Sequence, residues 1–216
     1  MELNIWAQSI AGLLYSAFWG LSCVLLILPI ALLGSGFLVK ETRFSDFFNS
    51  LIDVFLALPA QLLLLILAAL LGGSPLALII AMTVTHAPEK IRHLSLQLKR
   101  AYNDPLIEAA RALGFSRTHV FFKYVLAKLY LPLLMSAISI FKHFIISESL
   151  LTYLGLGSDP LSPSLGRLIS EGRGYLFFDA SRFLLPVFTL SLLLIVLQRV
   201  GDRFSSLFQL RGIRYL

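Results

Sequence analysis

Long apolar segments alternate with short polar segments along the chain, and most of the apolar segments are long enough to cross a membrane. An α-helix needs roughly 20 apolar residues to cross the hydrocarbon core of a bilayer. The third apolar segment is shorter than this, but it can extend to Pro75 at one end and Ala87 at the other, and we expect a membrane helix here as well. The pattern predicts spans at residues 9–39, 47–71, 75–87, 129–147 and 183–199. We therefore expect an all-α integral membrane bundle of five transmembrane helices, forming a single domain over residues 1–216.

The main hydrophilic region covers residues 88–128, and its second half has the pattern of a helix, a glycine turn and a second helix. Asp104 is a good helix N-cap, and Pro105 follows at the first helical position, where a missing N–H costs nothing. Gly114 stands where a left-handed helix stop belongs, and Ser116 can cap the next helix. In a membrane protein, such a unit offers a surface to which a soluble partner can bind.

Composition supports the membrane interpretation. Hydrophobic residues make up 57% of the chain and charged residues only 14%, whereas a soluble domain carries about 25% charged residues. The net charge of +6 could suggest nucleic acid, but Lys and Arg also gather in the cytoplasmic loops of membrane proteins, which is the favoured explanation. The single cysteine, Cys23, excludes an intrachain disulfide and gives no metal-site spacing.

The distribution of basic residues orients the expected spans. With five spans, fourteen Lys and Arg residues fall on the side of residues 40–43, the 88–128 loop and the C-terminal tail. Only three fall on the side of the N-terminus and residues 148–182, a segment rich in Gly, Ser and Pro that we expect to be external and mostly non-helical. The positive-inside rule then puts the N-terminus outside and the C-terminus in the cytoplasm. The first residues lack a basic region, so no cleaved signal peptide is expected.

Motifs for covalent chemistry are absent from the sequence. There is no glycine-rich loop ending in Lys-Ser or Lys-Thr, no paired metal-ligand motif and no nucleophile elbow. The four histidines are scattered along the chain. We therefore expect no enzyme activity, no catalytic residue, no cofactor and no metal site.

Two stretches resemble a known transporter family. Glu108-Ala109-Ala110, with Gly114 four residues later, resembles the EAA loop of ABC-importer permeases, in which this loop forms a coupling helix that docks on a cytoplasmic ATPase. The second stretch, ESLLTYLGLG at residues 148–157 followed by PSLG at 163–166, resembles a signature of the dipeptide, oligopeptide and nickel branch. Weaker matches stand at residues 53–59 and 201–202.

The chain also departs from that family. Members usually carry an extra N-terminal span and an extracellular stretch before the five-helix core, whereas here the core begins almost at once. The Leu-Pro-Asn that follows the coupling helix appears as Leu126-Ala127-Lys128, and the Trp of the second signature is Leu165. These local departures leave the expected coupling loop recognisable.

The resemblance implies a type I ABC importer permease in a bacterial cytoplasmic (inner) membrane. Such a chain forms half of the translocation pathway for peptides or for nickel and metal chelates, and couples the pathway to ATP hydrolysis. The implied partners are a sister permease in a heterodimer, two cytoplasmic ATPase subunits or domains, an extracytoplasmic substrate-binding protein and the lipid bilayer, but no nucleic acid. A secondary transporter or channel without ATPases is the alternative, which internal inverted repeats would favour; we see none.

The resemblance and the charge pattern together select candidate functional residues. Those for ATPase coupling are Glu108, Ala109, Ala110, Arg111 and Gly114; those of the family signature are Gly155, Gly157, Pro163 and Gly166. Ionisable residues within spans are costly and usually face a bundle interior or a cavity. Candidates for the pathway or for helix pairing are Asp53, Lys142, His143 and Glu148. Lys142 and His143 could meet a substrate carboxylate; alternatively, Lys142 snorkels to the outer interface or pairs with an acid of a partner subunit.

Overall fold

A computed structural model of the chain describes residues 5–40, 42–156 and 163–212, and every regular element in these ranges is helical. The all-α prediction is confirmed. The helices in chain order are α1 (Ile5–Leu38), α2 (Arg43–Ala57), α3 (Ala60–Leu70), α4 (Pro75–Tyr102), α5 (Pro105–Ala112), α6 (Arg117–Val120), the π-helical turn η1 (Phe121–Val125), α7 (Leu126–Tyr153), α8 (Leu165–Gly172), the 3₁₀ turn η2 (Arg173–Tyr175) and α9 (Ser181–Gly212).

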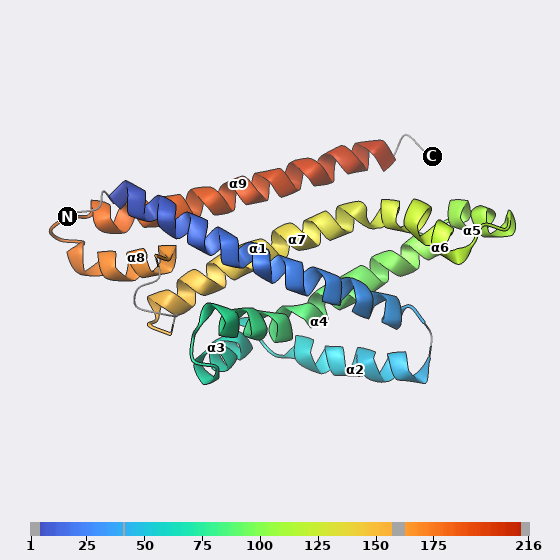
Figure 1. The fold of residues 1–216 in the computed structure, drawn as a ribbon, viewed down its shortest axis with the longest axis horizontal. Helices are drawn as coiled ribbons and strands as arrows, with labels where there is room; N and C mark the ends of the chain where they lie inside the picture. The colour runs from blue at the N-terminus through green and yellow to red at the C-terminus, as the bar shows by residue number, and fades with distance from the viewer. Residues whose placement is uncertain (1–4, 41, 157–162, 213–216) are drawn as a thin grey trace.

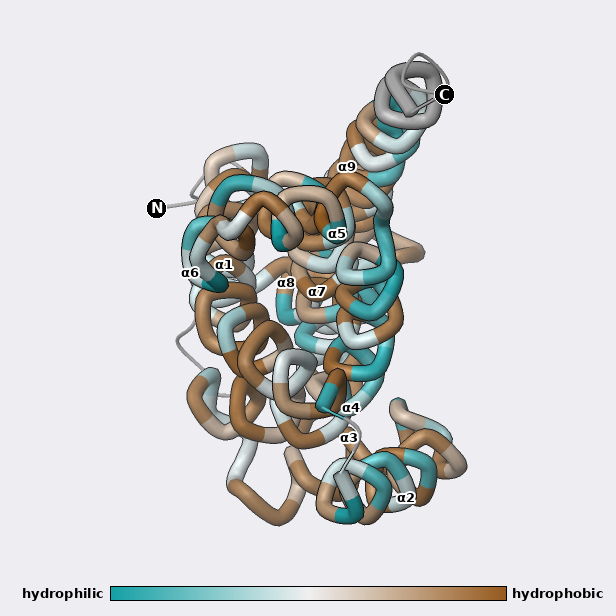
Figure 2. Tube along the Cα trace, turned by 90° about the vertical axis from the view of Figure 1, so that its right-hand side faces the viewer, coloured by the Kyte–Doolittle hydropathy of each residue, from teal (hydrophilic) through white to brown (hydrophobic). Residues whose placement is uncertain are grey.

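The long helices α1, α4, α7 and α9 run along the long axis of the molecule (Figure 1). Their shared core contains Ile27, Met82, Ile140 and Phe144, whose side chains are almost completely buried. The short helices lie at opposite ends: α5 and α6 at one end, α8 beside the start of α1 at the other. Figure 2 looks along the long axis from the α5–α6 end and shows hydrophilic residues gathered on α4, α5 and α6.

Within the described part of the chain, three helical stretches are individually long and apolar enough to cross a membrane. They are α1, the continuous stretch Arg117–Tyr153 and residues Ser181–Ser206 of α9. The pair α2 and α3 meets the same criterion only if both count as one span, and the two helices are bent by 88°. The arrangement of five spans therefore stays a prediction.

The bend between α2 and α3 differs from the continuous segment expected at residues 47–71. Leu58 precedes a proline, which disfavours the helical conformation, and it is extended here at φ −86° and ψ 139°. Pro59 then begins α3 without a backbone N–H to donate. The Leu58-Pro59 pair is visible in the sequence, but the segment is uniformly hydrophobic, and a continuous span was therefore expected.

Helix α4 also extends further than the sequence suggested. It continues from the expected span through Pro88 to Tyr102, so the first part of the expected 88–128 loop is a helix packed against α1 and α7. Lys90, counted above among the loop cations, is 5% exposed. Charged residues here therefore belong partly to the interior of the bundle.

The expectation that residues 148–182 are mostly non-helical is wrong for the described part of this segment. Helix α7 continues to Tyr153, and α8 begins after Ser164, whose hydroxyl accepts a hydrogen bond from the Arg167 N–H at 3.2 Å. The glycines of α8 serve close packing: a Cβ on Gly166 would lie 2.5 Å from Ser149 Cα. Composition alone does not separate a glycine that ends a helix from one that lets helices touch.

Candidate functional site

Residues 104–120, which we call the projecting unit, fold as the sequence predicts. The Asp104 carboxylate accepts a hydrogen bond from the Leu106 N–H at 2.9 Å, and Pro105 occupies the first turn of α5. Gly114 has φ +83°, and the N–H of Phe115 bonds to the Ala110 carbonyl at 3.3 Å, which closes the helix end. Ser116 then caps α6. The prediction of helix, glycine turn and helix is confirmed.

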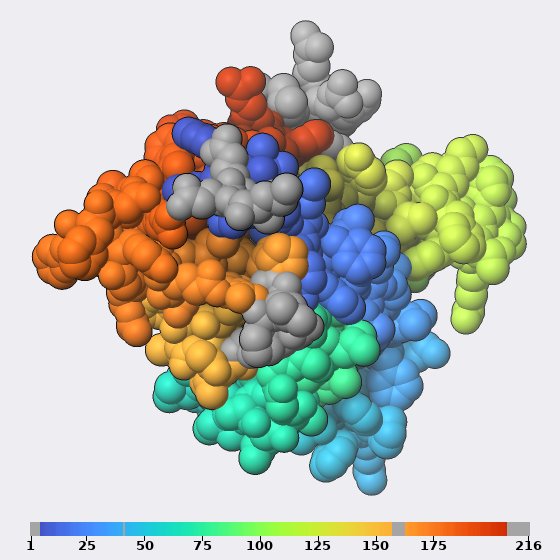
Figure 3. Space-filling model, turned by 60° about the vertical axis from the view of Figure 1, so that its left-hand side comes forward, coloured from blue at the N-terminus to red at the C-terminus, as the bar shows by residue number. Residues whose placement is uncertain are grey.

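The projecting unit has a buried side and an exposed side. Ile107 and Ala110 are buried against the end of α4 and against Val120 and Val125. Ala110 thus packs within this chain, so only its neighbour Ala109 is available for close approach by another protein. The exposed side carries both charged and large apolar groups: Glu108, Arg111, Leu106, Leu113 and Phe115. In Figure 3 the unit, coloured yellow-green, projects from the body of the molecule.

Two contacts attach the projecting unit to the long helices. The Lys128 ammonium at the start of α7 forms an ion pair with Asp104, and its hydrogen bond lowers the pKa of that carboxyl. The Arg111 guanidinium lies over the Tyr102 ring of α4, 5.1 Å from its centroid. Lys128 belongs to the Leu-Ala-Lys departure from the family motif, and here it fixes the base of the unit.

The structure places the four candidate polar residues of the spans in separate surroundings. Asp53 of α2 accepts a hydrogen bond from Arg92 of α4 at 2.5 Å between Oδ1 and Nη1. Lys142 of α7 donates to the Gln198 side chain of α9 at 2.5 Å. The Gln198 amide in turn donates to the Asp202 carboxylate at 3.0 Å, and Gln198 and Asp202 are both exposed. Asp53 therefore connects α2 to α4, and Lys142 connects α7 to α9. Lys142, Gln198 and Asp202 together form a polar row that continues along α9.

His143 belongs to a buried polar cluster that the sequence analysis missed. Its ring lies 5.0 Å from the ring of His86, and its Nδ1 lies 2.8 Å from the Ser139 carbonyl oxygen. Lys90 Nζ donates to Ser139 at 3.0 Å and to Glu89 at 2.9 Å. Glu89 and Lys90 fall in the expected loop of residues 88–128, although His86 falls in the expected span, so the contact of this face of α4 with α7 was not predicted. The four-residue spacing of His86 and Lys90 on one helical face was the available signal.

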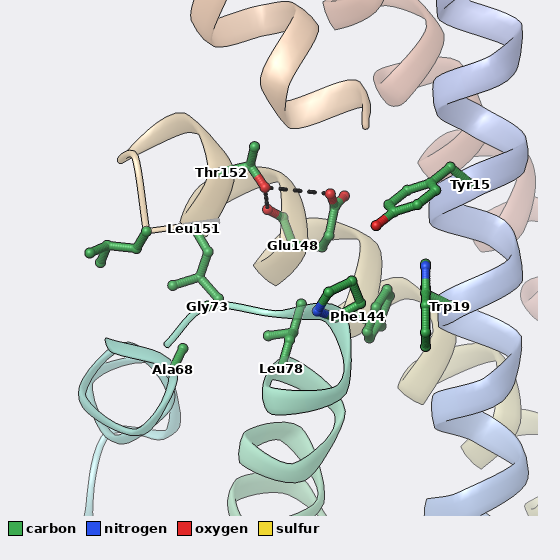
Figure 4. A pocket seen from close by; sticks show the side chains of 11 residues that line it. Tyr15, Trp19, Ala68, Gly73, Leu78, Phe144, Glu148, Leu151 and Thr152 are labelled. Atoms are coloured by element: carbon green, nitrogen blue, oxygen red, sulfur yellow. Dashed lines mark hydrogen bonds between the residues drawn. The ribbon is translucent and has the colours of Figure 1, made fainter. Parts of the chain in front are cut away.

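Glu148 lies at the far end of α7, where it is 8% exposed. Ser16 of α1 donates to its Oε2 at 3.0 Å, and Thr152 donates to its Oε1 at 3.4 Å. Figure 4 shows the carboxyl directed into a small cavity beside Tyr15 and Trp19 of α1. The carboxyl therefore joins two long helices at the end opposite the projecting unit.

The family-signature residues lie around this same end. Gly155 follows α7 with φ +77°, and Gly166 lies against the backbone of Ser149. Pro163 is exposed just before α8, and Gly157 lies outside the described residues. No group of three His, Cys, Asp or Glu side chains in the described ranges is arranged to hold a metal ion.

Apolar helices of spanning length, polar contacts between them and a capped unit projecting at one end define a multi-helix membrane subunit. The chain belongs to the family of binding-protein-dependent transport system inner membrane components, whose model matches residues 27–210. It is thus a multi-pass inner-membrane component of a transporter, and not an enzyme.

Curated relatives agree with this family. A putative peptide transport system permease of Brucella suis is 26% identical over 202 residues, and a di/tripeptide transport system permease of Pseudomonas aeruginosa is 28% identical over 202 residues. These alignments cover 92% of this chain and 67% and 66% of the relatives. A peptidoglycan transport system permease of Agrobacterium fabrum is 30% identical over 214 residues, which are 94% of this chain but 54% of that protein. The resemblance to the permeases of peptide ABC importers is confirmed.

Solved structures support the fold. A chain of the MetNI methionine ABC transporter, in an inward-facing conformation, matches with a TM-score of 0.63 and 21% identity over 92% of this chain and 91% of that one. A chain of an amino acid ABC transporter matches with a TM-score of 0.57 and 17% identity over 98% of this chain and 100% of that one. The type of helical architecture is therefore that of ABC importer permeases.

Proposed function

We propose that this chain is a permease subunit of a peptide importer and that its projecting unit couples it to a cytoplasmic ATPase. The observation that carries the proposal is the exposed α5–Gly114–α6 unit within a chain of this family. Eight residues of α5 are about 12 Å long at 1.5 Å per residue, a rigid element of a size that a groove can hold. Glu108 and Arg111 are exposed and available for ion pairs, while Ala109 permits close approach.

The proposed orientation puts the projecting unit in the cytoplasm. The end of α1, the projecting unit and the C-terminal part of α9 all lie at one end of the long axis (Figure 1). Residues 40–43, 88–128 and 199–214, which include or adjoin these regions, hold fourteen of the eighteen Lys and Arg residues, and the positive-inside rule assigns them to the cytoplasm. The N-terminus and α8 are then external.

The polar row of Lys142, Gln198 and Asp202 supports a pathway on the side of α7 and α9. Lys142 lies in the middle of an apolar helix and is bonded to an exposed amide near the end of another, and such groups are costly against lipid and are expected to face water or another subunit. We therefore propose that this side faces the sister permease and the pathway between the two chains. Unchanged substrate uptake in a Lys142→Leu variant would reject this assignment.

Peptides are the proposed cargo because several relatives are named for peptide transport. Residues 148–166 resemble the signature of the dipeptide, oligopeptide and nickel branch, so nickel or a metal chelate is the other cargo implied. The transport experiment below therefore tests nickel as well as peptide. A substrate-binding protein would deliver either cargo from outside.

The test reconstitutes the chain with its sister permease, ATPases and binding protein in liposomes. We expect uptake of labelled dipeptide that requires ATP and the binding protein; uptake of nickel alone would replace the peptide assignment, and uptake without ATP would favour a secondary transporter. Glu108→Arg should leave the complex assembled in the membrane but abolish stimulation of ATPase activity by the loaded binding protein. Asp46→Arg, an equally exposed carboxylate on α2, is the control that should retain stimulation.

A further inference from the structure

A small cavity lies at the external end of the molecule, between α1, the turn before α4 and α7 (Figure 4). Its walls include Tyr15, Trp19, Phe144, Glu148 and Leu151. The centre of a water-sized group can occupy about 10 Å³ inside this cavity. The cavity therefore has room for one such group. The cavity is therefore mainly apolar, with one carboxyl group in its wall.

The carboxyl group has hydrogen-bond donors but no cation. Ser16 donates a hydrogen bond to one oxygen, and Ser164 at the start of α8 is a further hydroxyl partner. The Thr152 hydroxyl donates to the Glu148 main-chain carbonyl at 2.8 Å and lies 3.4 Å from the second carboxyl oxygen. Among the described residues, no Lys, Arg or His forms an ion pair with Glu148. An ionised carboxylate that is mostly buried without a cation is unfavourable, so a small cation entering this cavity would gain a strong electrostatic attraction.

Aromatic rings supply a second attraction for a cation. Tyr15 and Trp19 lie one turn apart on α1, with ring centroids 6.4 Å apart at an interplanar angle of 65°. Figure 4 shows Tyr15 beside the Glu148 carboxyl and Trp19 a turn further along α1, beside Phe144, and both line the cavity. The faces of such rings attract ammonium groups within about 6 Å of the ring centroid. A carboxylate combined with aromatic walls and room for one water-sized group fits a protonated primary amine.

We propose that this cavity binds a protonated primary amine and, resting on the proposed peptide import, that it receives the amino terminus of the peptide on the external side, before the peptide enters the pathway. The Glu148 carboxylate accepts the ammonium hydrogen bonds, and Tyr15 and Trp19 surround the rest of the group. The competing explanation is a neutral carboxyl that only holds α1, α7 and α8 together through Ser16, Thr152 and Ser164. The two explanations differ in what Glu148→Gln does, because glutamine can keep hydrogen bonds to these hydroxyls but lacks the charge.

The experiment places 4-cyanotryptophan at position 19 of this chain in the assembled importer and follows its emission during titration with glycinamide. We expect a saturable change with glycinamide and none with N-acetylglycinamide, which lacks the amine. Glu148→Gln should weaken the apparent affinity at least roughly tenfold, the size expected from losing a charge-assisted hydrogen bond. Glu171→Gln, an exposed carboxylate on α8, should leave the affinity unchanged.

The results separate this inference from the proposed function. No saturable response, an equal response to the acetylated compound, or an equal affinity in Glu148→Gln would each overturn the amine site. ATP-driven dipeptide uptake by the same unmodified importer is measured in parallel. If uptake is present without an amine response, only the site is rejected; if uptake is absent, the peptide import is rejected whatever the emission shows.

Discussion

The two ends of the molecule use glycine for different reasons. At the projecting unit, Gly114 has φ +83°, but a Cβ built there would meet nothing within 4 Å. At the α8 end, a Cβ on Gly166 would lie 2.5 Å from Ser149 Cα and 2.6 Å from its carbonyl oxygen. The first end is therefore an open surface whose backbone is specified by a turn. The second is a packed junction in which α8 lies directly against α7.

The strongest test of this contrast is Gly166→Leu. The added side chain cannot fit against the Ser149 backbone, so α8 must move away from α7, and we expect a loss of about 3 kcal/mol or more. The readout is the midpoint temperature of unfolding of the purified complex. Gly36→Leu in α1 is the matched control, because a Cβ there meets no atom within 4 Å and stability should stay close to that of the wild type. Equal midpoints for the two variants would refute the packed junction.

A smaller effect is expected at Gly114. Alanine in a left-handed conformation costs about 1–2 kcal/mol, whereas asparagine tolerates this conformation better. Gly114→Ala should therefore destabilise the turn by about 1 kcal/mol, with Gly114→Asn closer to the wild type. Hydrogen exchange of the α5 amides measures the local opening. If alanine protects these amides as well as glycine does, the turn does not require its positive φ.

The smallest effect concerns the ion pair of Asp104 and Lys128 at the base of the projecting unit. Both side chains are partly exposed, so Lys128→Ala should cost no more than about 1 kcal/mol near neutral pH. The hydrogen bond from Lys128 lowers the pKa of Asp104 in the folded chain. Its stabilising contribution is therefore present above the unfolded pKa of about 3.9 and is lost as the pH falls through the lower folded value.

Stability measured against pH checks this assignment. The difference between the wild type and Lys128→Ala should shrink as the pH falls below about 4, because protonated Asp104 no longer carries the charge that Lys128 pairs with. Arg100→Ala in α4, which removes an exposed cation, provides the comparison for a removed surface charge. A difference that stays constant between pH 7 and pH 3 would show that the ion pair contributes nothing.

The accuracy of the sequence predictions differed between these regions for physical reasons. Caps and turns act over three to five residues, so Asp104, Pro105, Gly114 and Ser116 could be assigned from local sequence alone. The α8 end depends on contacts between distant residues. Glycine composition at residues 148–182 suggested loops, although Gly166 permits close packing of α8.

The polar interior was the least predictable part. A charged residue after a short apolar segment suggests a loop, but α4 continues and places Lys90 beside Ser139, 49 positions later in the chain. Likewise, hydropathy gave no sign that Leu58 and Pro59 bend the second segment by 88°. Such pairings depend on how the long helices cross, which a pattern of apolar residues does not specify.

Cross-linking from Ala109 tests most directly whether the projecting unit contacts the ATPase. Cys23, the single cysteine, is completely buried, so a cysteine introduced at Ala109 is the accessible thiol of this chain and can be labelled with a benzophenone maleimide before the ATPases are added. Gly174→Cys at the opposite end of the molecule, where a Cβ meets no atom within 4 Å, is the matched control. We predict a photo-cross-link to the ATPase from position 109 and none from position 174. No cross-link from position 109, or equal cross-linking from both positions, would contradict the proposed coupling.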